Sequence, residues 1–252
     1  MDVQQSSNGK WVLVSGGSRG IGRALVSALA REGYQVAFTY QSSADAALQL
    51  EREVAASGGL ALGHACDGRS HGSVEAVCAQ LVETLGEPYG LINNMGVTGD
   101  QLLLKFDIER YRDVVATNLD SAVYFSKCLA PAMAAERRGK ILHMSSVSGF
   151  KGNKGQLSYS ATKAAMIGIT KTMALELARF KINVNAIAPG FIATEMVEQI
   201  ADPVRKSITD TIPLKRFGEV REVAALASFL LSTQADYITG QTFVIDGGLT
   251  VW

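Results

Sequence analysis

Short apolar segments alternate with segments of helical periodicity along almost the whole chain, and this alternation restricts the folds open to it. The expected strands are residues 11–15, 35–40, 61–65, 90–93, 140–145, 183–188 and 242–245. The expected helices are residues 20–32, 44–56, 73–85, 108–136, 159–179 and 219–231, where apolar residues recur three and four positions apart. Such alternation is typical of right-handed βαβ units, and continuous Val, Ile and Leu runs are typical of strands covered on both faces. The sequence therefore predicts an α/β fold: a doubly wound, parallel seven-stranded sheet with helices on both faces.

The length and charge of the chain narrow the prediction further. Its 252 residues suffice for one large α/β domain, so we expect residues 1–252 to form a single domain. Lys plus Arg and Asp plus Glu number 24 each, and this balance does not favour binding to nucleic acid or to an anionic membrane. We find neither a secretory signal at the beginning nor an apolar run of about 18 residues, and therefore expect a cytoplasmic protein without a membrane span.

The three cysteines, Cys66, Cys78 and Cys128, are widely spaced and odd in number. This favours packed thiols over a disulfide framework, and the spacing is not that of metal ligands, so we expect no metal site. The segment 189–217 has no clear periodicity. Because long irregular insertions in compact domains are often functional, we expect a substrate lid at about 190–217.

A glycine-rich turn follows the first expected strand. It reads Ser15-Gly16-Gly17-Ser18-Arg19-Gly20-Ile21-Gly22 and leads directly into a helical segment. Glycines allow a backbone to approach a pyrophosphate closely, and the N-terminus of the following helix attracts phosphate. The alternative is a connection that only turns the chain, but its position between strand and helix favours a dinucleotide site.

The end of the second expected strand indicates which dinucleotide binds. A carboxylate there would accept hydrogen bonds from a ribose 2′-hydroxyl, but the chain reads Tyr40-Gln41-Ser42. Arg19 in the glycine turn is suited to pairing with a 2′-phosphate, unless it is only a solvated turn residue. We therefore expect NADPH rather than NADH.

A serine, a tyrosine and a lysine form the candidate catalytic set. Ser146 closes the fifth expected strand, and Tyr159 and Lys163 are separated by one helical turn, so their side chains share a face. Hydride transfer to a ketone requires a proton donor at the carbonyl oxygen. We expect the ammonium of Lys163, together with the nicotinamide charge of the oxidised cofactor, to lower the pKa of the Tyr159 phenol for that role. Ser146 would polarise the same oxygen. A Tyr–Lys pair at this spacing also arises by chance on an ordinary amphipathic helix, and only its context makes it persuasive.

Together these motifs resemble the short-chain dehydrogenase/reductase family, with its Rossmann-like fold, over residues 11–248. Two positions depart from the family pattern: Ser15 replaces a threonine in the glycine turn, and Met95 replaces an alanine in Asn93-Asn94-Met95-Gly96. The resemblance implies that Asn118 takes part in proton supply to Lys163. The alternative is an asparagine satisfied by neighbouring backbone.

The resemblance also implies the cofactor contacts. Asp67 would accept from the adenine amino group, although it could equally cap the next helix. The segment around Pro189 and Gly190 would orient the nicotinamide, or is simply a turn that ends a strand. The full set of candidate cofactor-binding residues is Gly16, Ser18, Arg19, Gly20, Ile21, Gly22, Tyr40, Gln41, Ser42, Asp67, Gly68, Asn94, Met95, Gly96, Tyr159, Lys163, Pro189, Gly190, Ile192 and Thr194.

Within the family the chain looks most like the 3-oxoacyl-[acyl-carrier-protein] reductases of fatty-acid biosynthesis, through residues 95–100, 152–156 and 238–241. This implies reduction of a carrier-bound 3-oxoacyl thioester, an acyl-carrier protein as partner and a homotetramer built partly from helices 108–136 and 159–179, while the apolar end 249–252 is a second candidate contact between subunits. The alternatives are another ketone, such as acetoacetyl-CoA, a polyketide or a sugar-type substrate, or a nucleotide-binding protein without activity.

An acidic carrier requires a local basic patch near the site. The candidate residues are Arg137, Arg138, Lys140, Arg179 and Lys181. The alternative is that they are solvated cations at helix ends, which complement the helix dipoles.

Overall fold

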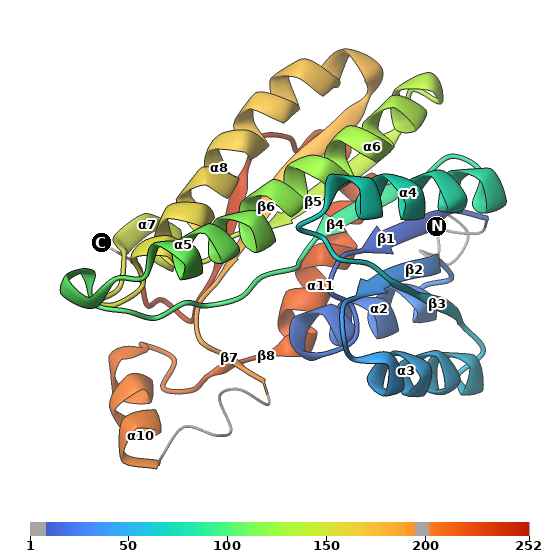
Figure 1. The fold of residues 1–252 in the computed structure, drawn as a ribbon. Helices are drawn as coiled ribbons and strands as arrows, with labels where there is room; N and C mark the ends of the chain where they lie inside the picture. The colour runs from blue at the N-terminus through green and yellow to red at the C-terminus, as the bar shows by residue number, and fades with distance from the viewer. Residues whose placement is uncertain (1–8, 195–201, 252) are drawn as a thin grey trace.

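Seven parallel strands form the central sheet of the computed structural model, which describes residues 9–194 and 202–251. In chain order they are β1 (Trp11–Val14), β2 (Gln35–Tyr40), β3 (Leu60–Ala65), β4 (Gly90–Asn93), β5 (Gly139–Met144), β6 (Ile182–Pro189) and β9 (Thr242–Ile245). Their order across the sheet is β3-β2-β1-β4-β5-β6-β9 (Figure 1). Every neighbouring pair is parallel, which confirms the predicted fold class.

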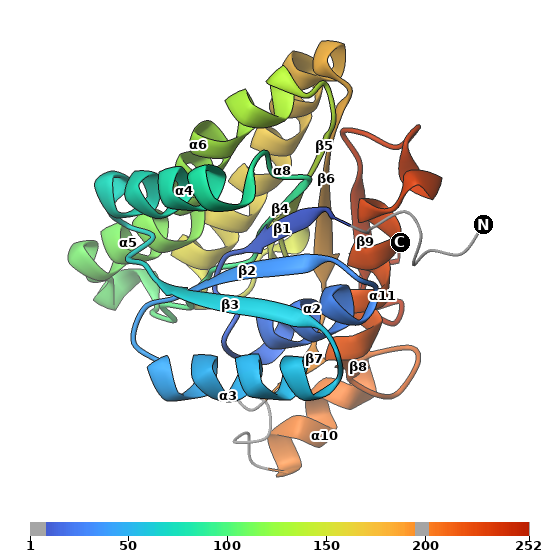
Figure 2. The ribbon, with the colours of Figure 1, turned by 90° about the vertical axis from the view of Figure 1, so that its right-hand side faces the viewer.

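Helices cover both faces of the sheet, as Figure 2 shows. One layer contains α2 (Gly20–Arg31), α3 (Ala44–Ala56) and α11 (Val220–Leu231). The other contains α4 (His71–Leu85), α5 (Ile108–Val115), α6 (Ser121–Ala135) and α8 (Leu157–Leu177). Successive strand residues belong alternately to the two hydrophobic cores: in β1, Val12 and Val14 pack in one, and Trp11 and Leu13 in the other. This explains why the strands are continuous apolar runs.

The chain reverses its direction across the sheet between β1 and β4. From β1 it proceeds to β2 and β3 on one side, and from β4 to β5, β6 and β9 on the other. The carboxyl ends of strands at such a switch point leave a crevice in which α/β proteins bind ligands. The glycine turn follows β1 and the Asn93–Gly96 segment follows β4, so both lie at this crevice.

Two expected elements differ from the structure. The helix expected at 108–136 is divided into α5 and α6 by a π-helical turn, Ala116–Asp120. The segment expected to be irregular, 189–217, contains the strand β7 (Ile192–Ala193), which pairs with β8 (Gly218–Glu219), and the helix α10 (Asp202–Thr211). Residues 195–201 of the expected lid lie outside the described residues, as do residues 1–8.

The described helices include none that is both long and apolar enough to cross a membrane. Likewise, the described side chains contain no group of three or more His, Cys, Asp and Glu residues arranged to bind a metal. The three cysteines are free thiols, and Cys66 and Cys78 are buried, as expected of packed thiols.

Candidate active site

The glycine turn is attached to the end of β4 by hydrogen bonds of two side chains. The Ser15 hydroxyl accepts from the backbone N–H groups of Asn94 and Met95, at 3.0 and 3.1 Å. In return, the Asn94 amide Nδ2 donates to the carbonyl oxygens of Ser15 and Gly16, at 3.1 and 3.0 Å. A serine hydroxyl therefore accepts these two hydrogen bonds at the position where the resembled family has a threonine.

Three glycines shape a cradle at the N-terminus of α2. Gly16 and Gly20 have φ angles of 66° and 54°, in the left-handed region that favours glycine. A Cβ atom on Gly22 would overlap the carbonyl oxygen of Gly16. Among the described residues no side chain caps α2, so its first N–H groups face the crevice. This donor set suits a phosphate group.

The end of β2 lies beside this turn. Gly17 N–H donates to the carbonyl of Thr39, and Gly16 N–H donates to the Thr39 hydroxyl at 3.2 Å. Thr39 is fully buried, and the sequence reasoning missed it because it lies inside a strand. The candidates Tyr40, Gln41 and Ser42 follow directly. Arg19 is exposed and forms no ion pair with any described residue, so its charge is available to a ligand.

Asp67, at the end of β3, is already paired. Arg69 donates to both of its carboxylate oxygens, from Nε and from a terminal guanidinium nitrogen, at 2.9 Å each. The Arg69 hydrogen bonds hold the pKa of Asp67 below its usual value. Asp67 does not cap α4, since Ser70 accepts from Ser73 N–H there. The neighbouring Gly68 lies against the Met95 thioether, which occupies the space that a Cβ at 68 would need.

Ser146, Tyr159 and Lys163 converge as expected. Ser146 follows β5 and is 8% exposed, and it acts on the Tyr159 phenol of α8 by lowering its pKa. The Lys163 Nζ lies 5.5 Å from the centroid of the Tyr159 ring. The same Nζ donates to the carbonyl oxygen of Met144 at 2.6 Å, and Lys163 is only 3% exposed.

The pKa values of this pair differ from our expectation. Burial raises the pKa of Tyr159, the hydrogen bond with Ser146 lowers it, and the Asp100 carboxylate raises it, with a net shift upward. The Lys163 ammonium, which we expect to lower this pKa together with the nicotinamide charge, does not offset burial in the protein alone. Instead, burial lowers the pKa of Lys163 itself to about 8, because desolvation disfavours the charged form. In the ligand-free site the tyrosine therefore holds its proton tightly, and the lysine releases its proton more readily than an exposed lysine.

Asn118 lies in the π-helical turn and is fully buried. Its amide Nδ2 donates to the Val97 carbonyl at 2.9 Å and to the Thr162 hydroxyl at 3.2 Å, while its Oδ1 accepts from Val97 N–H at 2.7 Å. Backbone partners thus satisfy the side chain, as in the alternative interpretation. A Cβ on Gly96 would lie 3.4 Å from Lys163 Nζ and 3.5 Å from Asn118 Oδ1, so the two side chains meet at Gly96. π-Helical turns are frequent at functional sites.

The segment after β6 approaches the glycine turn from the other side. Gly190 packs against Asp246, where a Cβ would lie 2.7 Å from the Asp246 Cβ, and Gly190 N–H donates to the Ile245 carbonyl. The Thr194 methyl group lies 3.7 Å from the position of a Cβ on Gly20. The two ends of the proposed cofactor site, more than 170 residues apart in sequence, are therefore neighbours in the fold.

The basic residues proposed to lie near the pocket mouth are at the opposite edge of the sheet. Arg137 and Arg138 precede β5, and Arg179 and Lys181 precede β6, whereas Ser146 follows β5. Lys140 is buried and paired with Asp236 at 2.6 Å, so its charge is not available on the surface. Within one chain the expected basic patch is not next to the candidate site, because the chain returns to the amino-terminal edge before each parallel strand.

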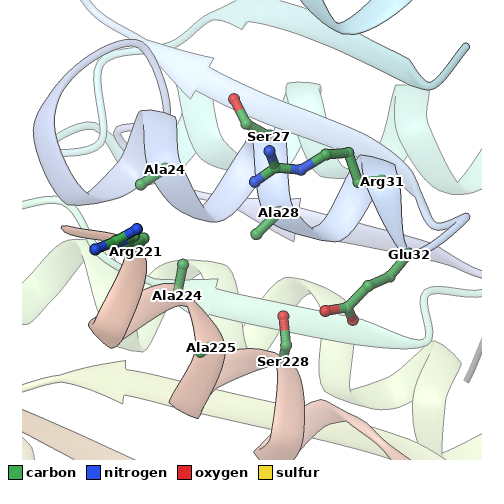
Figure 3. Close-up of a pocket in the computed structure, with 9 residues that line it drawn as sticks. All are labelled: Ala24, Ser27, Ala28, Arg31, Glu32, Arg221, Ala224, Ala225 and Ser228. Atoms are coloured by element: carbon green, nitrogen blue, oxygen red, sulfur yellow. The ribbon is translucent and has the colours of Figure 1, made fainter. Parts of the chain in front are cut away.

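A groove of about 370 Å³ lies elsewhere, between α2 and α11 (Figure 3). Side chains of these two helices face each other across it, and the small residues Ala24, Ala28 and Ala224 allow their close approach. None of the residues that line this groove is a candidate site residue.

Comparisons with known proteins find relatives that match nearly the whole chain. The family model described as Enoyl-(Acyl carrier protein) reductase matches residues 16–250. The 3-oxoacyl-[acyl-carrier-protein] reductase FabG of Staphylococcus epidermidis is 40% identical over 240 residues, covering 95% of this chain and 98% of the relative. The 3-oxoacyl-[acyl-carrier-protein] reductase of Synechocystis sp. is 40% identical, covering 95% and 96%. FabG of Vibrio cholerae is 39% identical, covering 96% and 97%.

Proposed function

The chain belongs to the short-chain dehydrogenase/reductase family, and on this premise we propose that it reduces a 3-oxoacyl thioester on acyl-carrier protein to the 3-hydroxyacyl thioester with NADPH. The observation that carries the proposal is the buried Lys163, whose Nζ lies 5.5 Å from the centroid of the Tyr159 ring, with Ser146 next to the same phenol. The full-length similarity to 3-oxoacyl-carrier-protein reductases supports the choice of substrate.

The crevice fits the cofactor through features of its own. The cradle of Gly16, Gly20 and Gly22 would hold the pyrophosphate through backbone N–H groups, and the exposed Arg19 would pair with the 2′-phosphate. Gly68 and Met95 would border the adenosine, and Asp67, which is paired with Arg69, would accept from the adenine amino group. The segment from Pro189 to Thr194 borders the nicotinamide side. When bound, NADPH supplies the hydride.

The residues of this chain supply the proton and hold the substrate oxygen. Ser146 and Tyr159 direct two hydroxyl groups to the oxygen that gains negative charge during reduction. The raised pKa of Tyr159 keeps the phenol protonated at neutral pH, which is the form that a proton donor requires. Lys163, whose pKa of about 8 lies near neutrality, restores the proton to Tyr159. Asn118 holds the Gly96–Val97 segment next to the Lys163 side chain.

The segment at about 190–217 acts as the substrate lid of a single-domain enzyme. Backbone hydrogen bonds fix both ends of this segment: β7 pairs with β8, and Leu214 N–H donates to the Gly247 carbonyl. A lid fixed at both ends excludes water from the site when the substrate is bound.

A second candidate reaction is reduction of an enoyl thioester, because the matching family model carries that description. The two reactions differ in the group reduced: a carbonyl oxygen must be held and protonated in one, and a carbon–carbon double bond is reduced in the other. Two hydroxyls directed to one point favour the carbonyl. Another ketone, such as acetoacetyl-CoA, remains compatible with the same residues.

The partner of the enzyme is the acidic acyl-carrier protein, and the assembly is a homotetramer in the cytoplasm. Apolar side chains on the outer surfaces of α6 and α8 support subunit contacts there: Val123 is 37% and Leu175 84% exposed in the single chain.

A substrate panel tests the proposal. NADPH consumption is measured with 3-oxoacyl-carrier protein, the matching 3-oxoacyl-CoA, enoyl-carrier protein and an unrelated cyclic ketone. We expect the highest kcat/KM with 3-oxoacyl-carrier protein. A clear preference for the enoyl substrate, or for the unrelated ketone, would reject the assignment.

A further inference from the structure

Two segments on opposite sides of the candidate site are joined by a pair of polar side chains. Gln156, just before α8, directs its amide Nε2 at Asp100, 3.3 Å from each carboxylate oxygen. The backbone strengthens this contact, since Gln101 N–H donates to the Gly155 carbonyl at 2.7 Å and Gln101 and Gln156 form an isolated parallel bridge. The segment after β4 is thereby attached to the segment that precedes α8.

The hydrogen bonds continue from Gln156 to Ser146. Gln156 Oε1 accepts from the Ser148 hydroxyl at 3.2 Å and from Asn153 Nδ2 at 3.0 Å. The same Asn153 Nδ2 lies 2.9 Å from the Ser148 hydroxyl, and Ser148 N–H donates to Ser146 Oγ at 3.1 Å. The Gln156 amide thus uses its nitrogen on Asp100 and its oxygen on the residues that hold Ser146.

Asp100 also acts on Tyr159 through its charge. Among the described residues, the charged groups that face the phenol are Asp100, from the segment after β4, and Lys163, from α8 itself. Burial and the Asp100 carboxylate raise the pKa of Tyr159, while Ser146 lowers it. An exposed carboxylate near a proton donor therefore favours the protonated phenol.

We propose that Asp100 and Gln156 form a latch that positions Ser146 and Tyr159 for reduction. The inference rests on the proposed function, because it names residues that serve the same site. Neither residue touches the reacting atoms; both are positioning residues that act through Ser146 and Tyr159.

Four variants distinguish the effect of the Asp100–Gln156 hydrogen bond from the effect of the negative charge of Asp100. Asp100→Ala removes the acceptor, and Gln156→Glu places two carboxylates against each other, so both open the latch. The double variant Asp100→Asn/Gln156→Glu exchanges donor and acceptor and closes it again, because a carboxylate at 156 still accepts from Ser148 and Asn153. Asp100→Asn alone keeps an acceptor but removes the charge. Asp107→Asn is the matched control, since this nearby carboxylate caps α5 through Glu109 N–H, a role asparagine fills equally well.

The first readout is steady-state kinetics with NADPH and a 3-oxoacyl-carrier protein. We expect the two latch-opening variants to lower kcat/KM by about tenfold, a loss typical of a mispositioned group. The double variant should recover to within about threefold of the wild type, and the Asp107→Asn control should match the wild type. Failure of the double variant to recover any of the loss would reject the latch.

The second readout does not depend on turnover. The ionisation of Tyr159 is followed by the ultraviolet absorbance difference between the wild type and Tyr159→Phe, with the same subtraction for each variant. Asp100→Asn should move the phenol ionisation to lower pH, because a negative charge that raised its pKa is gone. Hydrogen exchange of residues 149–157 should be faster in Asp100→Ala and unchanged in Asp107→Asn.

These readouts distinguish the two claims. If the wild type reduces no 3-oxoacyl substrate but the ionisation and exchange change as described, the proposed function fails and the latch stands. If the enzyme is active and neither quantity responds to Asp100→Ala or Asp100→Asn, the latch is wrong and the proposed function stands.

Discussion

Tyr159 and Lys163 show how burial changes the chemistry of two side chains. From the sequence, we expected the ammonium to make the phenol more acidic. The structure shows a phenol whose pKa is raised by burial and a lysine whose pKa is lowered to about 8 by the same cause. The sequence identified both residues because their spacing is local, but it could not give the balance between desolvation and charge, which depends on elements from several parts of the chain.

The same limit applies to Asp100 and Gln156. Both lie in segments that resemble the 3-oxoacyl-[acyl-carrier-protein] reductases. Their contact, however, joins loops that are 56 residues apart in sequence. Nothing in the local pattern specifies such a pair. Arg69 is a similar case, since its pairing with Asp67 modifies a contact that the resemblance implied.

Arg19 should determine the preference for NADPH over NADH. Arg19→Ala removes the one charge we assign to the 2′-phosphate, while leaving the backbone N–H groups of the glycine turn. We expect the dissociation constant for NADPH to rise about 10–100-fold, the cost of one charge-assisted contact, and that for NADH to stay within about twofold. Isothermal titration calorimetry with both cofactors measures this. Equal losses for the two cofactors would show that Arg19 does not contact the 2′-phosphate.

His143 should make the protein sensitive to acid. It is fully buried in β5, neither ring nitrogen has a hydrogen-bond partner among the described residues, and burial and Lys163 lower its pKa to about 3. Between the unfolded pKa of about 6.5 and the folded value, the unfolded chain binds the extra proton, so stability falls as pH falls, by up to about 1.4 kcal/mol per pH unit.

His143→Met removes this titrating group without leaving an unpaired polar atom. We expect its melting temperature to decline less than that of the wild type between pH 6.5 and 4.5. His64→Met is the comparison, since His64 is only partly buried in the edge strand β3, where burial lowers its pKa and Glu51 raises it. An unchanged acid slope in His143→Met would contradict this account.

At the scale of elements, apolar strands and long amphipathic helices could be predicted closely. β2, β4, β9 and α3 have the expected bounds, because the apolar pattern of each element ends where polar or glycine residues follow. α10 could not be predicted, since only two of its 10 residues, Val204 and Ile208, have branched apolar side chains and neither is buried. The π-helical turn at Asn118 could not be predicted either, because it depends on the hydrogen bonds of Asn118 with Val97, a residue in another segment.

The turn between β1 and α2 should tolerate no added atom at Gly22. A Cβ there would overlap Gly16 and lie 2.7 Å from Asn94 Nδ2, so Gly22→Ala must displace the backbone that forms the phosphate cradle. We expect NADPH affinity to fall more than about 100-fold. Gly72→Ala is the matched control: a Cβ in α4 meets no atom within 4 Å, so binding should not change and the helix should be slightly stabilised. Fluorescence titration with NADPH measures both, and equal affinities would contradict the proposed cradle.

At the scale of the whole molecule, the sheet order brings residues distant in sequence to one crevice. The glycine turn, the end of β4 and the segment after β6 meet because all follow the carboxyl ends of parallel strands. The same topology places the basic residues that precede β5 and β6 at the opposite edge of the sheet. Their nearness to the site residues in sequence therefore does not predict nearness in space.

The proposed tetramer predicts a specific sensitivity. Leu175 is 84% exposed on α8, and Leu175→Glu would bury a charge in a helix-to-helix subunit contact. We expect the wild type to elute as a tetramer in light-scattering chromatography and the variant as dimers or monomers. Leu104→Glu, at a position 98% exposed in the loop before α5, provides the comparison outside these helices. A wild type that is monomeric at micromolar concentration would contradict the assembly.

The central claim is that Tyr159 donates the proton to a carbonyl oxygen of a 3-oxoacyl thioester. The most direct measurement compares NADPH consumption by the wild type and Tyr159→Phe with a 3-oxoacyl-carrier protein, alongside NADPH affinity of both proteins. We predict turnover by the wild type, a kcat lower by about two to four orders of magnitude in Tyr159→Phe, and equal NADPH affinity. Equal turnover by the two proteins would contradict the claim.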